Sequence, residues 1–480
     1  MGYNKYKRLM SDTVLFAISN FGSKILVFLL VPLYTNVLST EEYGIVDTVT
    51  TMTGFFVPVL TMLISEAILR FALEKDVDYI NILSNANTII VASTVFLLLL
   101  TPFVNLLEGE WSVLGDYWYW IVAIHFITSI NTNLNNYTRG IDKTKLFAAS
   151  GVLYTVVVIV SNLVYLLVFG LGTKGYLLAI VTAEIAAVMH KICFGKYVKV
   201  LCKYSFNFPL LKKMLVYSLP MVPSNVAWWV MQLSDKYVII NYLGLAASGV
   251  YSIAYKIPSI LSVITNIFVQ AWQVAAIKSS EDSDNEAFVK NVYSYFIVFS
   301  IAVSSMLIML AKPLGHVLYA NNYFSAWVYV PILIVAYHFS GLSGVLQSLY
   351  SAAKKTGMLF VSTSIGAALN IVLNLIFIPM FGVMAAAYTT MFSFVVTWLI
   401  RMIHSRRFVK IDLNYIRVGS SFILLICQAI FVSLDYRAMY LVSLAIMAVQ
   451  VLLFWREIKF IMSVVQSFLL GVLKKGKKQL

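Results

Sequence analysis

Charged side chains are scarce in this chain of 480 residues, of which they make up 12%, whereas hydrophobic residues make up 60%. Water-soluble domains carry about 25% charged residues, so a soluble fold could not hide this much apolar surface. Apolar runs of about 20 residues, long enough to cross the hydrocarbon core of a bilayer as a helix, recur along the chain. The sequence therefore predicts an all-α polytopic membrane protein.

Cysteine is also rare, and the three residues Cys193, Cys202 and Cys427 show no metal-ligand spacing. The chain contains no G-x-x-x-x-G-K-[ST] phosphate loop and no H-E-x-x-H zinc motif. The histidines are scattered over separate segments, which favours packing roles over metal ligation. We therefore expect a protein without a metal or cofactor that is not an enzyme.

Acidic residues are fewer than basic ones, and the formal net charge is +14. Nucleic-acid binding is not expected, because the basic residues fall in alternate loops, as membrane topology requires. This pattern predicts a membrane protein with both termini in the cytoplasm and an even number of spans. Residues assigned to inner segments include Arg70, Lys143, Lys191 and Arg401. About fourteen spans are expected, near 12–37, 45–69, 80–107, 116–138, 146–170, 175–194, 214–242, 248–275, 290–311, 325–350, 358–380, 383–404, 415–434 and 438–456.

An internal repeat suggests two related halves. Asn36-Val-Leu38 followed by Gly44 matches Asn241-Tyr-Leu243 followed by Gly249, an offset of about 205 residues. Two further weak matches follow in the same order, which favours a transporter with a pseudo-twofold axis along the membrane normal. We expect a six-helix bundle over 1–195, a cytoplasmic amphipathic linker over 196–213, a second six-helix bundle over 214–410, and two extra helices with a basic tail over 411–480. The linker could equally be an inner loop that obeys the positive-inside rule.

Three lysines are expected inside spans: Lys24, Lys236 and Lys256. An intramembrane charge is a functional hypothesis by default, and cations in a cleft between halves would suit an anionic, phosphate-bearing substrate. Intramembrane ion pairing is the alternative, and Lys236 could also extend toward the outer interface.

Three acids, Asp47, Glu184 and Asp235, are candidates for ion coupling. Asp47 could instead be a helix-start residue. Five prolines interrupt the charge-bearing spans and could act as hinges, although proline is common in membrane helices: Pro32, Pro58, Pro220, Pro223 and Pro258.

Several short segments resemble the Wzx-type polysaccharide flippases of the multidrug/oligosaccharidyl-lipid/polysaccharide exporter superfamily. They are Asn20-Phe-Gly22-Ser-Lys24, Pro32-Leu-Tyr34-Thr, Leu38-Ser-Thr-Glu-Glu-Tyr-Gly44, Ser234-Asp235-Lys236 and Gly249-Val-Tyr251. The resemblance implies two six-helix bundles around a cationic lumen and alternating access. In the superfamily's lipid II flippases, cations lie in the first and eighth spans, which correspond here to Lys24 and Lys256.

The resemblance also implies movement of undecaprenyl-pyrophosphate-linked oligosaccharide units from the inner to the outer leaflet of the bacterial cytoplasmic membrane, for capsule, exopolysaccharide or O-antigen assembly. An ion-coupled multidrug antiporter of the same superfamily is one alternative. A membrane glycan polymerase or ligase is another, which the short outer loops disfavour. The expected partners are the lipid-linked oligosaccharide, membrane lipids and other polysaccharide assembly proteins, with the chain acting as a monomer.

Overall fold

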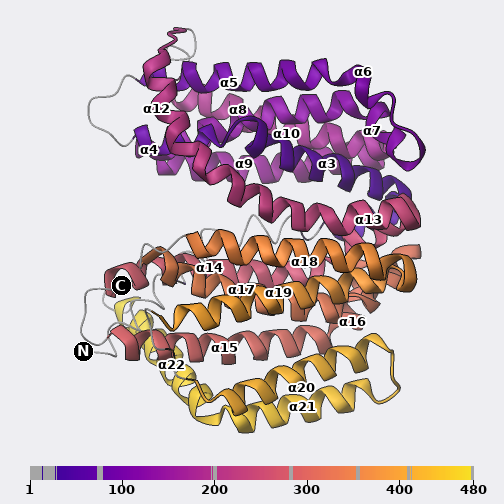
Figure 1. Cartoon of the computed structure of the whole chain (residues 1–480), viewed down its shortest axis with the longest axis vertical. Helices are drawn as coiled ribbons and strands as arrows, with labels where there is room; N and C mark the ends of the chain where they lie inside the picture. The colour runs from indigo at the N-terminus through magenta and orange to yellow at the C-terminus, as the bar shows by residue number, and fades with distance from the viewer. Residues whose placement is uncertain are drawn as a thin grey trace. The chain divides into compact units, whose positions relative to one another are not determined.

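The computed structural model is helical and confirms the expected all-α class (Figure 1). It describes residues 30–72, 79–195, 203–279, 285–352, 357–407 and 413–476, with Thr13, Phe28, Tyr197 and Ile411. Within this part of the chain, 10 helices are long and apolar enough to cross a membrane, or 12 if two bent pairs are each counted as one span. The count of fourteen stays a prediction, because much of the first expected span lies outside the described residues.

Contacts divide the chain into two compact units. The first unit is Ile25–Gly249, and the second unit contains Val250–Leu480. The expected division into two six-helix bundles, with a linker over 196–213 and two extra helices, stays a prediction. The helix α13 (Val222–Ala254), which is expected to open the second bundle, contributes most of its length to the first unit, because it packs against α3 (Thr40–Leu60). Whether the halves are repeats stays a prediction.

The first unit is a bundle whose long helices are joined by short helical segments. Contacts link α8 to α3, α4, α5 and α10, and α10 in turn to α9. Besides α3 and α13, its elements are α2 (Val31–Val37), α4 (Ile64–Ala72), α5 (Tyr79–Leu99), α6 (Thr101–Val104), η1 (Gly109–Ser112), α7 (Val113–Asp116), α8 (Trp118–Gly140), α9 (Thr144–Asn162), η2 (Leu163–Val168), α10 (Gly172–Gly195), α12 (Phe208–Ser218) and η3 (Leu219–Met221).

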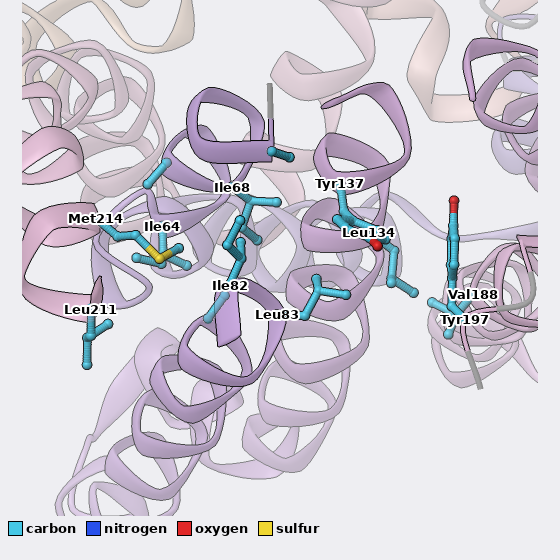
Figure 2. Packing of buried hydrophobic residues seen from close by; sticks show 13 residues of the cluster. Ile64, Ile68, Ile82, Leu83, Leu134, Tyr137, Val188, Tyr197, Leu211 and Met214 are labelled. Atoms are coloured by element: carbon cyan, nitrogen blue, oxygen red, sulfur yellow. The ribbon is translucent and has the colours of Figure 1, made fainter. Parts of the chain in front are cut away.

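A hydrophobic core at one end of this unit joins segments that are far apart in the sequence (Figure 2). Ile64 and Ile68 of α4 meet Ile82 of α5, and Leu211 and Met214 of α12 pack on the same cluster. The apolar face of α12 is thus buried, while its lysines 212 and 213 are exposed. The helix α12 is amphipathic, and the protein itself covers its apolar face. The expected amphipathic linker over 196–213 stays a prediction.

The end of the linker is anchored to α5 by side chains. The carboxamide of Asn85 donates to the carbonyl of Asn207 (2.9 Å) and accepts from the amide of Asn207 (3.0 Å). The hydroxyl of Ser84 accepts from the amide of Ser205 (3.1 Å). Asn85 is fully buried. Its side-chain amide therefore supplies hydrogen bonds to the non-helical backbone before α12, where water cannot supply them.

Two glycines allow α3 and α13 to cross in close contact. A Cβ atom on Gly44 would lie 2.2 Å from the carbonyl oxygen of Leu245, and one on Gly249 would lie 2.0 Å from that of Thr40. Only glycine permits this approach of backbones. The two contacts are reciprocal at the same offset of about 205 residues, which is the pattern of an isologous, twofold contact.

The repeated turns themselves have corresponding breaks. In the first copy, Leu38 and Ser39 are extended between α2 and α3. In the second copy, Gly244 breaks α13 with φ of 86° and ψ of 170°, at the position that corresponds to Ser39. A positive φ is accessible to glycine at no steric cost, so the backbone conformation of this turn explains why residue 244 is a glycine.

The second unit is centred on α17 (Val330–Ala352), which contacts α14, α15, α19 and α20. Near the C-terminus, α22 bends by 79° from α21. The further elements of this unit are α14 (Lys256–Ser279), α15 (Asn285–Met309), α16 (Ala311–Leu318), η4 (Asn321–Val328), α18 (Gly357–Phe381), α19 (Val383–Ser405), α20 (Tyr415–Ser433), α21 (Met439–Leu453) and α22 (Trp455–Gly476).

We predict that Gly44→Ala and Gly249→Ala each lower the free energy of unfolding by about 1–3 kcal/mol, because each added methyl group would overpack the crossing of α3 and α13. Gly151→Ala in α9 is the matched control, since a Cβ atom there meets nothing within 4 Å. Unfolding of the purified variants in detergent micelles measures the difference. Equal stability of all three variants would show that the backbones do not approach this closely.

Candidate functional site

Two of the charged residues expected inside spans form one ion pair in the first unit. The Nζ atom of Lys236 on α13 lies 2.6 Å from a carboxylate oxygen of Asp47 on α3, with side-chain exposures of 16% and 17%. The same Nζ atom donates to the hydroxyl of Thr51 (2.6 Å). Asp47 and Thr51 are four residues apart and share a helix face. The alternative of intramembrane ion pairing therefore applies to Lys236.

The start of α3 explains where Asp47 lies. The Ser39 hydroxyl accepts from the Glu42 amide (3.1 Å), and the Glu42 carboxylate accepts from the Ser39 amide (2.8 Å), which is a capping box. The helix thus begins at Thr40, two turns before Asp47. The interpretation of Asp47 as a helix-start residue is wrong, because Ser39 and Glu42 already fulfil that role.

Glu184 lies in a buried polar group between α8 and α10. Its carboxylate accepts a hydrogen bond from the Thr128 hydroxyl (3.2 Å) and another from the Asn131 amide. The ammonium group of Lys191 donates to the carbonyl oxygen of Asn131. Glu184 is 7% exposed and Lys191 only 1%, so the carboxylate and the ammonium are both withdrawn from solvent and joined through one amide.

A cavity of about 280 Å³ adjoins this group. Thr128 is part of its wall and also bonds Glu184. Pro58, one of the expected hinge residues, lies in the same wall. The remaining lining residues come from α3, α8 and α10 and are Thr50, Thr53, Gly54, Val57, Ile124 and Ile180.

The other charged candidates are Asp235, Lys256 and Lys24. Asp235 is buried in α13, on a different face from its neighbour Lys236. Lys256 is half-buried at the start of α14, in the second unit. Lys24 lies outside the described residues. The binding and coupling roles of these residues stay predictions.

The five prolines lie at or beside helix breaks. Pro58 is in the last turn of α3, after which Met62 and Leu63 have positive φ angles before α4 begins. The others are placed as follows: Pro32 in the first turn of α2, Pro220 in η3, Pro223 at the start of α13, and Pro258 in the first turn of α14. A hinge function for these breaks stays a prediction.

Two basic residues assigned to inner segments, Lys191 and Arg401, are buried inside helices, and their assignment to the inner side stays a prediction. Lys191 is one of them, and its spacing of seven residues from Glu184, two helical turns, is the signal that could have identified the pair. Arg401 in α19 is the other. Its guanidinium donates to the Ser362 hydroxyl (2.9 Å) and to the Thr363 hydroxyl (2.8 Å).

Arg401 also donates to the carbonyl of Ser343 (3.2 Å) and to the side chain of Gln347 (3.5 Å). Among the residues that the structure describes, none of its hydrogen-bond partners is acidic. The guanidinium fork therefore joins α17, α18 and α19 through neutral oxygens. The sequence offers no signal for this arrangement, because the partners are ordinary serine, threonine and glutamine residues.

The second unit contains a further buried polar group that the sequence did not indicate. The Asn374 amide donates to the Asn370 carbonyl oxygen (3.1 Å), and the Thr389 hydroxyl donates to Asn374. Thr389 also lines an apolar groove of about 610 Å³ between α18 and α19. The rest of that groove is formed by Leu373, Phe377, Phe381, Met384, Ala385, Tyr388 and Phe392.

A family model described as polysaccharide biosynthesis protein matches residues 9–273 of this chain. An uncharacterized membrane protein of Methanocaldococcus jannaschii is 26% identical over 421 residues, which are 82% of this chain and 96% of that protein. The probable low-salt glycan biosynthesis flippase Agl15 of Haloferax volcanii is 24% identical over 227 residues, 44% of this chain and 46% of the relative.

Solved structures share the fold. The lipid II flippase MurJ, in an inward closed conformation, superposes with a TM-score of 0.62 at 17% identity, covering 93% of this chain and 99% of that one. An inward-facing multidrug resistance transporter of the MATE family gives 0.61 at 15% identity, covering 83% and 94%. At these identities the likeness concerns the fold alone.

We predict that Asp47 and Lys236 stabilise each other by about 1–3 kcal/mol in a double-mutant cycle made with Asp47→Asn and Lys236→Met, because the pair is largely withdrawn from water. Lys312 and Asp435 are the matched control: they also lie 2.6 Å apart, but their side chains are 24% and 50% exposed. Their coupling should stay below about 1 kcal/mol. A coupling of Asp47 with Lys236 no larger than this control would contradict the pairing.

Proposed function

This chain belongs to the polysaccharide biosynthesis protein family, and we propose that it flips undecaprenyl-pyrophosphate-linked oligosaccharide units from the inner to the outer leaflet of the cytoplasmic membrane. Transport would proceed by alternating access and would serve capsule, exopolysaccharide or O-antigen assembly. The chain acts as a monomeric, non-enzymatic carrier with both termini in the cytoplasm. Its partners are membrane lipids and other polysaccharide assembly proteins.

One observation carries this proposal: the Lys236 ammonium is held inside the helical part of the first unit by the carboxylate of Asp47. An intramembrane cation is costly and is retained where it serves transport. A phosphate oxygen can take the place of a carboxylate oxygen as the partner of an ammonium group. Lys236 therefore fits a site at which a pyrophosphate exchanges with Asp47.

We assign the remaining roles on the same reasoning. Lys24 and Lys256 also bind pyrophosphate during transport, because cations match its negative charge. Asp47, Glu184 and Asp235 are the acids that can bind a coupling ion. The five prolines named above mark the positions at which helices bend during the cycle.

Two other functions remain candidates. A multidrug antiporter is favoured by the shared fold with the MATE-family transporter. The Glu184 group argues against an exported organic cation, since Lys191 is already joined to that carboxylate through Asn131. A membrane glycan polymerase or ligase would need catalytic groups in outer segments, and these loops are short.

The test is translocation of a fluorescent undecaprenyl-pyrophosphate oligosaccharide in proteoliposomes. We predict that Lys236→Met, Lys24→Ala and Lys256→Ala each lower the initial rate by about tenfold or more, because removing one charge-assisted contact costs about 1.5–3 kcal/mol. Lys312→Ala is the control, as this exposed lysine pairs with Asp435 instead. The same glycan on a polyprenyl monophosphate separates recognition of the pyrophosphate from recognition of the lipid.

Translocation that is lost in all three variants, with folded protein and an active Lys312→Ala control, supports the flippase and its cations. Translocation that is unaffected by the three substitutions would retain the function and refute the site. Proton- or sodium-driven export of an organic cation, with no glycan movement, would make this protein a drug antiporter.

A further inference from the structure

The stretch of chain that contains α12 carries charge of one sign only. Every charged residue between Glu184 and Asp235 in the sequence is a lysine. Lys203, Lys212 and Lys213 belong to the described residues of this stretch, and all three are exposed. Within the described part of the chain, no carboxylate lies at ion-pair distance from any of the three. Their positive charges can therefore interact with an anion outside the protein.

Exposed apolar side chains alternate with these lysines. On α12, Phe208, Lys212 and Val216 follow one another at intervals of four residues, so they form one row on the helix surface. Phe208 is 63% exposed and Val216 is 64% exposed. In the segment before the helix, Tyr204 and Phe206 are exposed as well. Basic side chains beside exposed aromatic rings are typical of a surface that lies at the boundary between membrane and water.

The opposite face of α12 is occupied by the protein, which holds the exposed face in one orientation. Leu211 and Met214 pack on the hydrophobic core beside the first turns of α5 (Figure 2). The Asn85 carboxamide holds the backbone that precedes the helix. The hydroxyls of Tyr204 and Thr88 share a hydrogen bond (3.0 Å). The exposed lysines and rings thus belong to a segment that is tied to α5 at several points.

The attachment to α5 also indicates where this surface lies in the membrane. The helix α5 is one of those long and apolar enough to cross the hydrocarbon core. The ends of such a helix lie at the two membrane surfaces. Because Asn85 and Thr88 belong to the first turns of α5, the segment that they hold lies close to the headgroups of one leaflet.

We propose that the exposed face of α12, together with residues 203–208, is a binding surface for the headgroups of anionic phospholipids. The lysines are complementary in charge to the lipid phosphates, and each lysine near an anionic membrane surface strengthens the attraction. The exposed rings fit the layer between headgroups and acyl chains, because aromatic side chains are favourable there. This inference goes beyond the proposed transport function, since it concerns the lipids that surround the protein and not the lipid that it carries.

Headgroups bound to this surface would also fix the start of α13. The helix α12 continues through η3 directly into α13, which carries Lys236. An α12 held against the headgroups therefore anchors one end of the helix that forms the ion pair with Asp47.

Photoreactive lipids test the surface directly. The full chain is reconstituted in vesicles of phosphatidylcholine and phosphatidylglycerol, with a trace of either lipid carrying a photoreactive group beside its headgroup. Mass spectrometry of the digested protein then locates the crosslinks. We expect phosphatidylglycerol to label residues 203–217 of the wild type, and the double variant Lys212→Gln/Lys213→Gln to lower this labelling by about 25-fold, because each lysine contributes about fivefold. Labelling by phosphatidylcholine, which has no net charge, should not change.

The double variant Lys174→Gln/Arg437→Gln is the matched control, because it removes the same charge from exposed residues outside this surface. Its labelling of residues 203–217 should equal that of the wild type. The preference of the wild type for phosphatidylglycerol should also disappear at about 1 M salt, where the screening length falls to about 3 Å. If the lysine variant does not fold, this salt series decides alone.

Three results would overturn the proposal. The first is equal labelling of residues 203–217 by the two lipids in the wild type at low salt. The second is equal labelling by phosphatidylglycerol in the lysine variant and in the control. The third is a wild type whose residues 203–217 take no crosslink from either lipid, which would leave this surface to a protein partner.

Discussion

The hydrocarbon interior offers no water, so every polar group there must find its partner inside the protein. The described helices meet this constraint in three ways. Hydroxyls return to their own helix, as Thr48 does to the carbonyl of Gly44. Non-helical backbone is completed by a buried amide, as Asn85 does for the linker. Isolated charges are satisfied by neutral oxygens, as Arg401 shows with serine and threonine. In these three examples the polar side chain has a structural role before any functional one.

This grouping limits what the charged residues can do. Lys236 and Asp47 are already partners, so an anion that binds Lys236 must replace a carboxylate, and its affinity reflects the difference between the two contacts. Glu184 and Lys191 are instead linked through the side chain of Asn131, which donates to Glu184 and accepts from Lys191. Adding a proton to Glu184 therefore changes the charge of the group without requiring Lys191 to lose a direct ionic partner. The first arrangement suits ligand exchange, and the second suits protonation.

The sequence predicted the all-α class, because the scarcity of charge and the length of apolar runs report directly on burial in hydrocarbon. It also located the repeated turn, since glycine at 44 and 249 is required by the backbone crossing itself. It did not predict that α13 packs in the first unit, because unit boundaries depend on tertiary contacts that leave no periodic signal. Arg401 was missed for a related reason: a positively charged residue near the end of an apolar run has the same pattern whether it faces water or neutral oxygens. For Lys191 the signal existed in its spacing from Glu184.

The close crossing of α3 and α13 and the ion pair are parts of one contact. Asp47 follows Gly44 by three residues, about one helical turn, so both lie on the face of α3 that meets α13. Any motion that separates the two helices must remove the glycine contacts and break the ion pair together. Separation would also release Lys236 from its carboxylate. A ligand can shift this equilibrium only by binding one state more tightly, and an anion that needs a free ammonium group binds the separated state. The repeated glycine turn thereby links the arrangement of the helices to the charge that a phosphate-bearing substrate would meet.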